Sequence, residues 1–321
     1  MSNENLAVGV DLGATKIACV LLTEGGDVIA SSQVSTVPTD GMEAVLDKVA
    51  NQIDEMIHRA YSHVVGVGVG SPGKVDSTRG VVYDAVNLGW AKVNLTEEIS
   101  RRIGSVLPVW IQKDTNLSAL GEYYFGACQG CTDFVYVGVG SGLGGGIISG
   151  GHLITGGDWY AAELGHLSID PDGALCACGG HGCAETVASG PGLVRVTRQL
   201  LKDSSQKSAL ADMTELSPAD VLFAAEKNDA LAREALCQVG HALGIVMSAC
   251  SAILNPARFV IGGGLGLAGF NFIEPAVREE MMRRTIPNSR GALDIVPSQV
   301  ESSAIGSACL VWYALSGKMK S

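Results

Sequence analysis

The chain has 321 residues, enough for two domains of ordinary size with a core in each. Its 33 acidic residues outnumber its 22 basic residues, the formal net charge is −11, and no clustered basic stripe interrupts it, which argues against nucleic acid as a partner. Its 42 glycines and few aromatic residues are typical of an α/β protein with many tight turns between strands and helices.

Three observations bear on the compartment. The N-terminal segment lacks the basic and then apolar pattern of a secretory signal. The longest apolar run, residues 242–254, is shorter than the roughly 18 residues that a membrane-spanning helix needs. The odd total of 9 cysteines favours a reducing compartment over a disulfide framework. The sequence therefore predicts a cytoplasmic protein with no membrane partner.

The first predicted elements are three strands at residues 6–10, 17–22 and 28–34, which follow one another as a meander. The turn after the first strand brings a carboxylate, close backbone N–H groups, a hydroxyl and a cation to one tip, a combination that suits a bound phosphate with Mg²⁺. A solvated hairpin of ordinary turn-forming residues is the alternative. The residues concerned are Asp11, Gly13, Thr15 and Lys16.

A helix is predicted from about residue 41, with Asp40 as its cap and Glu43 three residues later. A strand follows at residues 64–69. The polar loop around Asn87 fits a wall that meets a small polar ligand, although it could equally be a plain loop. Asn94, with a glutamate three residues later, predicts the start of a second helix.

A short predicted strand at residues 109–112 ends in Lys113 and Asp114, and a helix is predicted over residues 117–125. An aspartate at the carboxyl end of a strand, where a helix begins, stands where open α/β sheets bind their ligands. Asp114 is therefore a candidate general base. The alternative is that Asp114 or Thr115 only caps the helix.

Two glycine-rich turns follow later strands. The GxGxxG match within residues 140–146 runs directly into a predicted strand at 147–148, so a hairpin that cradles phosphate is favoured over a dinucleotide site. A second match within residues 262–269 precedes a helix predicted over 270–284. It lacks the acidic residue that a dinucleotide site has about 20 positions later, and we interpret it as a nucleotide contact of another kind. Other predicted helices span 190–201, 217–226, 230–253 and 302–315.

The densest chemical motif is a cysteine block. Cys176, Cys178 and Cys183, together with one imidazole, supply the three sulfurs and one nitrogen of a closed tetrahedral zinc site. His166 lies before the block in a Glu-Leu-Gly-His motif and His181 lies within it, and their spacing does not decide between them. His166 could bind the metal through one nitrogen and a substrate hydroxyl through the other. Reduced, buried cysteines without a special role are the alternative.

Together these motifs resemble the ROK family of sugar kinases and repressors, close to its bacterial glucokinases. The resemblance covers essentially the whole chain, and the cysteine block with its upstream Glu-x-Gly-His is the most specific part. It implies an α/β fold of two ribonuclease-H-like domains of the actin and hexokinase type, with a cleft between them. Residues 1–115 plus 302–321 would form a small N-terminal domain with a returning C-terminal helix, and residues 116–301 a large domain carrying the zinc loop.

The resemblance also implies an ATP-dependent hexose kinase that phosphorylates the 6-hydroxyl of glucose, with Asp114 as the catalytic base. Zinc would be structural, because four protein ligands leave no open position. ATP and Mg²⁺ would meet Asp11, Gly13, Thr15, Lys16, Ser141, Gly142, Gly144, Gly263 and Gly264; the sugar would meet Asn87, Lys113, Asp114, Glu163, His166 and Glu185; and zinc would be held by His166, Cys176, Cys178 and Cys183.

One departure from the family concerns the sugar. The family usually has asparagine where this chain has Lys113, and lysine can only donate hydrogen bonds, reaches farther and favours the ionised form of Asp114. The substrate is therefore open between glucose, another hexose and an amino sugar such as N-acetylmannosamine, and a non-catalytic sugar binder is a further alternative. A sugar-responsive regulator would normally carry a DNA-binding helix-turn-helix before the first strand, which here begins at about Leu6. Family members are commonly dimers or tetramers.

Overall fold

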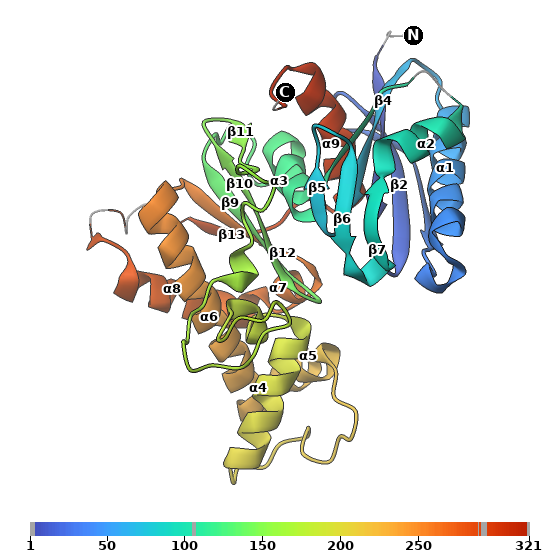
Figure 1. Ribbon diagram of the computed structural model, residues 1–321. Coiled ribbons are helices and arrows are strands. Elements are labelled where there is room, and N and C mark those ends of the chain that lie inside the picture. The colour runs from blue at the N-terminus through green and yellow to red at the C-terminus, as the bar shows by residue number, and fades with distance from the viewer. Residues whose placement is uncertain (1–3, 105–106, 288, 290–293, 320–321) are drawn as a thin grey trace. The chain divides into compact units, whose positions relative to one another are not determined.

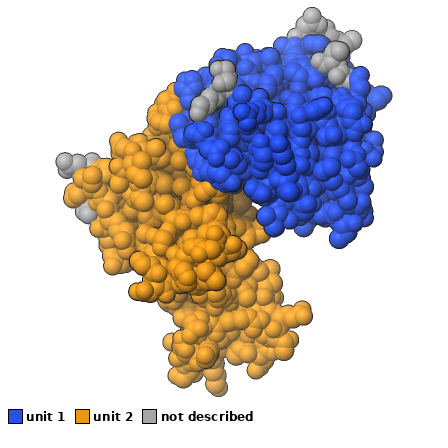
Figure 2. Space-filling model, in the orientation of Figure 1, with its two compact units in different colours: residues 1–130, 152–161, 299–321 blue, residues 131–151, 162–298 orange. Residues whose placement is uncertain are grey.

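The computed structural model (Figure 1) describes residues 4–104, 107–287, 289 and 294–319. It divides into two compact units, which Figure 2 distinguishes by colour: unit 1 comprises residues 1–130, 152–161 and 299–321, and unit 2 comprises residues 131–151 and 162–298. This division differs from the boundary predicted after residue 115. Helix α3 (Asp114–Phe125) stays in unit 1 because it packs against the closing helix α9 (Ser303–Leu315).

Unit 1 is built on a mixed sheet with the strand order β3-β2-β1-β4-β8. The predicted meander is confirmed: the first three strands pair antiparallel, whereas β4 and β8 run parallel to β1. β1 and β2 are almost continuously buried, and β3 alternates between partly buried and exposed residues, as an edge strand does. The bounds are β1 Leu6–Leu12, β2 Lys16–Thr23, β3 Val28–Ser35, β4 Val64–Ser71 and β8 Val109–Lys113.

Unit 1 also contains the helices α1 and α2 and a small antiparallel sheet. Asn94 caps α2 by accepting the backbone N–H of Glu97, as predicted. The predicted cap of α1 is wrong: Gly41 is the N-cap residue, and Asp40 lies in the preceding turn η1 (Pro38–Asp40), where it forms an ion pair with Lys48 at 2.9 Å. The elements are α1 Met42–His58, α2 Leu95–Ile103, β5 Lys74–Asp76, β6 Val81–Ala85 and β7 Trp90–Asn94.

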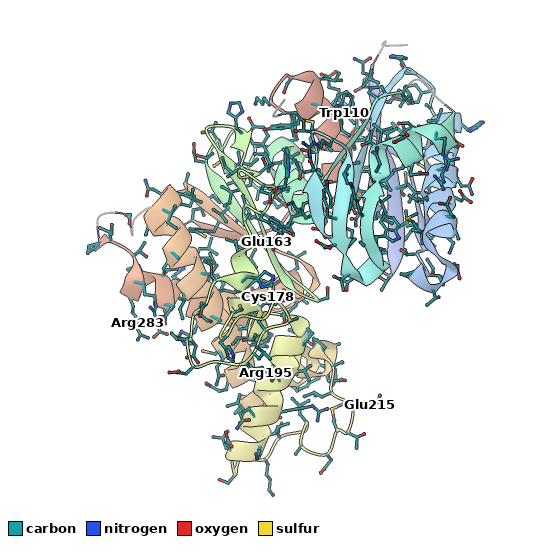
Figure 3. All side chains as sticks on the ribbon, in the orientation of Figure 1. Trp110, Glu163, Cys178, Arg195, Glu215 and Arg283 are labelled. Atoms are coloured by element: carbon teal, nitrogen blue, oxygen red, sulfur yellow. The ribbon has the colours of Figure 1, made fainter. Side chains whose placement is uncertain are left out.

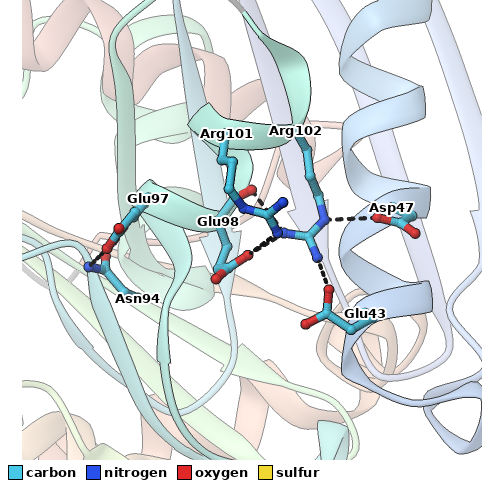
Figure 4. A network of polar contacts seen from close by, with 7 residues as sticks. All are labelled: Glu43, Asp47, Asn94, Glu97, Glu98, Arg101 and Arg102. Carbon is cyan, nitrogen blue, oxygen red and sulfur yellow. Dashed lines mark hydrogen bonds and ion pairs between the residues drawn. The ribbon is translucent and has the colours of Figure 1, made fainter.

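An arginine joins α1 to α2 (Figure 4). Arg102 on α2 contacts Glu98 on its own helix and reaches Glu43 and Asp47 on α1, with 2.8 Å between its Nε and Asp47 Oδ1. The arginine side chain is only 7% exposed, whereas its partners on α1 lie at the surface. The planar guanidinium can serve several carboxylates at once, so this one residue fixes the spacing of two helices.

Helix α9 packs on the first sheet, and at two glycines its backbone comes very close to that of the strands. A Cβ atom added to Gly9 of β1 would lie 2.1 Å from the carbonyl oxygen of Ala304, and one added to Gly68 of β4 would lie 1.8 Å from that of Ser307. On the other side of α9, a Cβ on Gly306 would lie 2.0 Å from the carbonyl oxygen of Leu117 in α3. Glycine at these positions therefore allows α9 to pack closely on β1, β4 and α3.

We expect Gly68→Ala to lower the free energy of unfolding by about 3 kcal/mol, because the new methyl group meets backbone atoms that cannot rotate away. Chemical denaturation of the purified variant measures this directly. Gly25→Ala is the matched control, since its Cβ would meet nothing closer than 3.5 Å. Equal stability of the two variants would contradict the packing described for α9.

Unit 2 contains a second mixed sheet, in which β10 pairs antiparallel with β9, and β12 and β13 continue parallel to β9. The strand predicted to follow the glycine turn is thus confirmed as β10. The bounds are β9 Phe134–Val139, β10 Leu143–Ser149, β12 Arg258–Gly262 and β13 Ile295–Pro297; the short β11, His152–Leu153, belongs to unit 1.

In the described part of unit 2, five α-helices accompany this sheet, and those predicted over residues 190–201, 217–226, 230–253 and 270–284 are confirmed. Helix α6 packs closely on α8 through Gly240, whose Cβ would lie 2.5 Å from the carbonyl oxygen of Ile273, and through Gly244. The bounds are α4 Gly190–Asp203, α5 Pro218–Glu226, α6 Ala230–Leu254, α7 Gly264–Ala268 and α8 Phe270–Arg284.

Helix α6 corrects the expectation drawn from the apolar run 242–254. The whole helix has 25 residues, and by length and composition alone it could cross a membrane. However, 61% of its most apolar 18-residue window is buried inside the protein, a property that core helices of soluble proteins share. We therefore assign α6 to the core of unit 2, where α4, α5 and α8 pack against it.

Candidate active site

The carboxyl ends of the parallel strands of unit 1 gather two predicted site residues. Asp11, near the end of β1, pairs with Gly70 of β4, and Gly70 pairs with Gln112 of β8. Asp114 follows β8 directly as the first residue of α3. Asp11 and Asp114 therefore lie at the same edge of this sheet, where α/β folds bind ligands.

Asp11 has a partner that local sequence could not indicate. The hydroxyl of Ser303, at the start of α9, donates a hydrogen bond to Asp11 Oδ2. Burial raises the pKa of the Asp11 carboxyl, and the Ser303 hydrogen bond and the charge of Lys16 offset part of that rise. The turn itself is held by Gly13, whose N–H donates to the Lys16 carbonyl at 3.0 Å. The arrangement suits a carboxylate that meets a cation.

Asp114 is oriented by a backbone hydrogen bond, and a buried amide bonds the residues around it. Its Oδ1 accepts the backbone N–H of Thr115 at 2.6 Å. The side-chain oxygen of Gln112, 3% exposed, accepts the N–H of Lys113 at 2.8 Å and the side-chain amide of Asn116 at 3.2 Å. The residue in the N-cap position is Lys113, which is 8% exposed and makes no side-chain cap. Neither of the two proposed capping residues thus occupies the N-cap position.

Asn87 lies in the turn η2 (Val86–Leu88) between β6 and β7, and it is exposed. Gly89 ends this turn with a φ of 72°. The left-handed conformation suits glycine and lets the chain reverse sharply before Trp90 enters the core at 5% exposure. The loop therefore has the exposed polar character that was predicted for it.

The cysteine block of unit 2 forms one compact cluster with His166. One ligand atom from each of His166, Cys176, Cys178 and Cys183 lies within 4.8 Å of every other. Cys178 Sγ and Cys183 Sγ are 3.6 Å apart, and Cys176 Sγ is 3.7 Å from His166 Nδ1. Two ligands on one tetrahedral zinc ion lie about 3.5–3.8 Å apart, so these residues fit that metal.

The structure also answers which histidine joins the cluster. His166 Nδ1 faces the sulfurs, whereas His181 Nδ1 lies 3.3 Å from the carbonyl oxygen of Gly173, and His181 is not in the cluster among the described residues. The loop closes tightly because Gly182 adopts a φ of 63° and a Cβ there would lie 1.5 Å from the Asp170 carbonyl oxygen. No larger residue fits at that position.

Glu163 immediately precedes the short helix η3 (Leu164–His166), which ends in the histidine of the cysteine cluster. This segment packs on the start of β10, where a Cβ on Gly165 would lie 2.3 Å from the Leu143 carbonyl oxygen. Ala162, just before Glu163, has a left-handed φ of 63°, which costs free energy for a residue with a side chain. Such strain is common at functional sites. Figure 3 labels Glu163 and Cys178 in unit 2.

Glu185 is bonded to the glycine hairpin. It lies in the turn η4 (Ala184–Thr186), and its Oε2 accepts the backbone N–H of Leu143 at 2.8 Å. At the hairpin tip, Ser141 is exposed, and the N–H of Gly140 donates to the Gly142 carbonyl at 2.9 Å. Gly144 lies inside β10, opposite Gly138 of β9.

A cavity of about 960 Å³ in unit 2 brings the two glycine-rich segments together. Its walls are largely apolar and come from the hairpin and from α4, α5 and α7. Gly263, beside the cavity, has a φ of 78°, and a Cβ there would lie 2.4 Å from the Val139 carbonyl oxygen. The lining residues are Gly140, Ser141, Gly190, Pro191, Val194, Leu216, Ser217, Pro218, Ala219, Leu222, Gly264, Leu265 and Ala268.

The family model described as ROK family matches residues 7–313, which is nearly the whole chain. The chain belongs to the ROK family. The architecture fits this membership, because ROK glucokinases share the two-domain α/β fold of the actin and hexokinase type.

Relatives of this ROK protein include both enzymes and regulators. It is 34% identical to a glucokinase of Thermotoga maritima, over 97% of this chain and 98% of that protein. It is also 30% identical to a xylose repressor of Caldicellulosiruptor bescii, over 94% of this chain and 76% of that protein. Among solved structures, a ROK family glucokinase from Streptomyces griseus in complex with glucose and AMPPNP matches with a TM-score of 0.81 and 31% identity, covering 95% of this chain and 98% of that one.

The structure of the ROK protein adds two features that its sequence did not indicate. The first is the apolar wall of the cavity, which includes Val194 and Leu222. These residues lie on helices whose apolar periodicity predicted only packing into a hydrophobic core. The hydrogen bond from Ser303 to Asp11 joins residues 292 positions apart. Only the position of Ser303 at a predicted helix start could have drawn attention to it.

Proposed function

We propose that this ROK protein is an ATP-dependent hexose kinase that phosphorylates the 6-hydroxyl of glucose, with Asp114 as general base. The observation that carries the proposal is Asp114, a carboxylate held at the carboxyl end of β8, in a chain related along almost its full length to glucokinases. A carboxylate there can also bind a sugar hydroxyl, so phosphorylation of the sugar is what distinguishes a kinase from a chain that only binds sugar.

In this mechanism Asp114 would take the proton of the attacking hydroxyl as that oxygen forms its bond to the γ-phosphorus, while the bond from the γ-phosphorus to the bridging oxygen breaks and ADP leaves. The hydrogen bond from the Thr115 N–H to Oδ1 fixes the orientation of the carboxylate. Bound ATP supplies the phosphoryl group, and Mg²⁺ neutralises charge on its phosphates. Phosphoryl transfer needs little covalent help from the protein, so a positioned base and well-placed donors are sufficient machinery.

We assign nucleotide-binding residues in each unit separately. In unit 1, we assign Asp11 to the binding of Mg²⁺ and Gly13, Thr15 and Lys16 to the phosphates. In unit 2, the apolar cavity suits an adenine ring. The unit 2 residues that we assign to the phosphates and adenosine are Ser141, Gly142, Gly144, Gly263 and Gly264.

Filling the cavity tests the nucleotide assignment. We expect Ala219→Trp, which places an indole at the cavity wall, to raise the KM for ATP about tenfold or more while the KM for the sugar changes little. Steady-state kinetics with each substrate varied in turn measures both values. Ala211→Trp, in the exposed loop before α5, is the control. An unchanged KM for ATP in Ala219→Trp would place the nucleotide elsewhere.

We also propose polar side chains that bind the sugar hydroxyls, and zinc would hold the loop that carries Glu163, His166 and Glu185. The metal has four protein ligands available, so we assign it a structural role. The sugar-binding residues that we propose are Asn87, Lys113, Asp114, Glu163, His166 and Glu185.

The deciding experiment measures ATP consumption by the purified, zinc-loaded protein with glucose, mannose, fructose, allose, N-acetylglucosamine and N-acetylmannosamine. A strong preference for glucose is the expected result and would mean that Lys113 is tolerated within a glucokinase site. Preference for an amino sugar would favour the second candidate function, an amino-sugar kinase. The observation that supports it is Lys113, a buried residue next to Asp114 in the sequence. Activity with none of these sugars would favour the binding role that the repressor relatives suggest.

We further propose that the protein works in the cytoplasm as a homo-oligomer, a dimer or tetramer, without a nucleic-acid partner. Light scattering on the purified protein measures the oligomeric state.

A further inference from the structure

One short segment connects the cluster of His166, Cys176, Cys178 and Cys183, called the metal cluster below, to the apolar cavity of unit 2 proposed for the nucleotide. It begins at the metal-facing Cys183 and ends at Gly190 on the cavity wall. Along the way it contacts the glycine hairpin twice: Glu185 Oε2 accepts the Leu143 N–H at 2.8 Å, and the Gly190 N–H donates to the Gly140 carbonyl at 2.7 Å. The segment therefore holds the hairpin on both sides of its tip.

The backbone around Glu185 is itself fixed by the metal loop. The N–H of Ala184 donates to the Leu167 carbonyl at 2.9 Å, next to His166, and the N–H of Thr186 donates to the Cys183 carbonyl at 2.9 Å. The Ser189 hydroxyl donates to the Glu185 carbonyl at 2.8 Å. The position of the Glu185 carboxylate thus depends on a backbone bonded to Cys183 of the cluster and to Leu167, the residue after His166.

The fit between Glu185 and the hairpin is close. A Cβ on Gly142 would lie 2.6 Å from Glu185 Oε2, so glycine at this position leaves the space that the carboxylate fills. The N–H groups of Gly140 and Leu143 are already bonded inside the protein. A bound phosphate would therefore be met by the tip, through the N–H groups of Ser141 and Gly142 and the Ser141 hydroxyl.

We propose that Glu185 is a positioning residue that transmits the geometry of the metal cluster to the glycine hairpin, so that nucleotide binding depends on the metal. The bond to Leu143 orients the hairpin tip before the nucleotide arrives, and preorganised donors bind charge better than donors that must first be ordered. The part that concerns nucleotide rests on the proposed function. The restraint of the hairpin by its hydrogen bond to Glu185, called bracing below, does not depend on the proposed function.

Hydrogen exchange measures the bracing without any ligand. In Glu185→Ala, the peptide covering residues 139–149 should exchange faster than in the native, zinc-loaded protein, because the Leu143 N–H loses its acceptor. Glu185→Gln should restore protection, since the amide oxygen can accept the same bond. Removal of zinc by a chelator should loosen the same peptide. Unchanged exchange in Glu185→Ala, or after zinc removal, would overturn the proposal. If Glu185→Ala does not fold, Glu185→Asp, whose side chain is one methylene shorter, takes its place.

Nucleotide affinity measures the consequence. We expect Glu185→Ala to weaken binding of a fluorescent ADP analogue about tenfold, the effect of losing one hydrogen bond to a charged group, and Glu185→Gln to stay within about threefold of the native protein. Faster exchange together with unchanged nucleotide affinity would also overturn the proposal. A native protein that binds no nucleotide would defeat the proposed function instead, and the exchange data would then decide on the bracing alone.

Discussion

Replacing Asp114 by asparagine is expected to lower kcat about a thousandfold, the effect of removing a general base from a phosphoryl transfer. Asparagine keeps the size of the side chain and an oxygen that can accept the Thr115 N–H, so the local fold around α3 should persist. What is lost is the ability to take a proton. A coupled assay for ADP production gives kcat, and calorimetric titration with the sugar shows whether binding survives.

Asp203→Asn serves as the control for this prediction, because Asp203 is an exposed aspartate at the end of α4 and should leave kcat unchanged. If Asp114→Asn turns over at the native rate, Asp114 is not the base. Sugar binding retained without turnover would instead agree with the role proposed for it.

Loss of the metal is expected to have the second largest effect. We expect the native protein to bind about one zinc ion per chain, and Cys176→Ser to lose most of it, because a hydroxyl is a poor ligand for this ion compared with a thiolate. Without the ion, the loop around Glu163 and Glu185 loses its fixed shape, so kcat/KM for the sugar should fall about a hundredfold. Metal analysis and steady-state kinetics on the same sample measure both effects.

Cys237→Ser is the matched control, since this partly buried cysteine lies on α6 and outside the metal cluster. It should retain both zinc and activity. Native protein purified under reducing conditions without chelator that contains no zinc would contradict the assignment of the cluster.

The metal cluster shows how far sequence reasoning reaches. Three of its ligands fall within eight consecutive residues, so their spacing alone predicts that they meet around one ion. The choice of histidine could not be made in this way. His181 is closer in sequence, but the chain reverses at Gly182 and directs its imidazole toward Gly173, while η3 carries His166 back to the sulfurs.

Contacts between distant residues lay beyond prediction. Glu122 is fully buried and accepts the N–H groups of Ala127, Gln299 and Val300, so one carboxylate ties the end of α3 to a segment some 177 positions away. From sequence, Glu122 is one polar residue in a helical pattern, and nothing local distinguishes a buried acceptor from a solvated charge. Strands and helices follow from periodicity, whereas pairings of this kind follow only from the completed fold.

The close packing of α9 on Gly9 and Gly68 bears on how the chain is made. The strands that it covers are synthesised before unit 2, whereas the helix is synthesised after it. Residues 131–298, which contain all of unit 2, are therefore synthesised before α9 can cover the sheet of unit 1. Until α9 is made, the face of β1 and β4 that it covers is exposed and can contact other chains, so synthesis of α9, rather than of the first strands, completes the burial of that face.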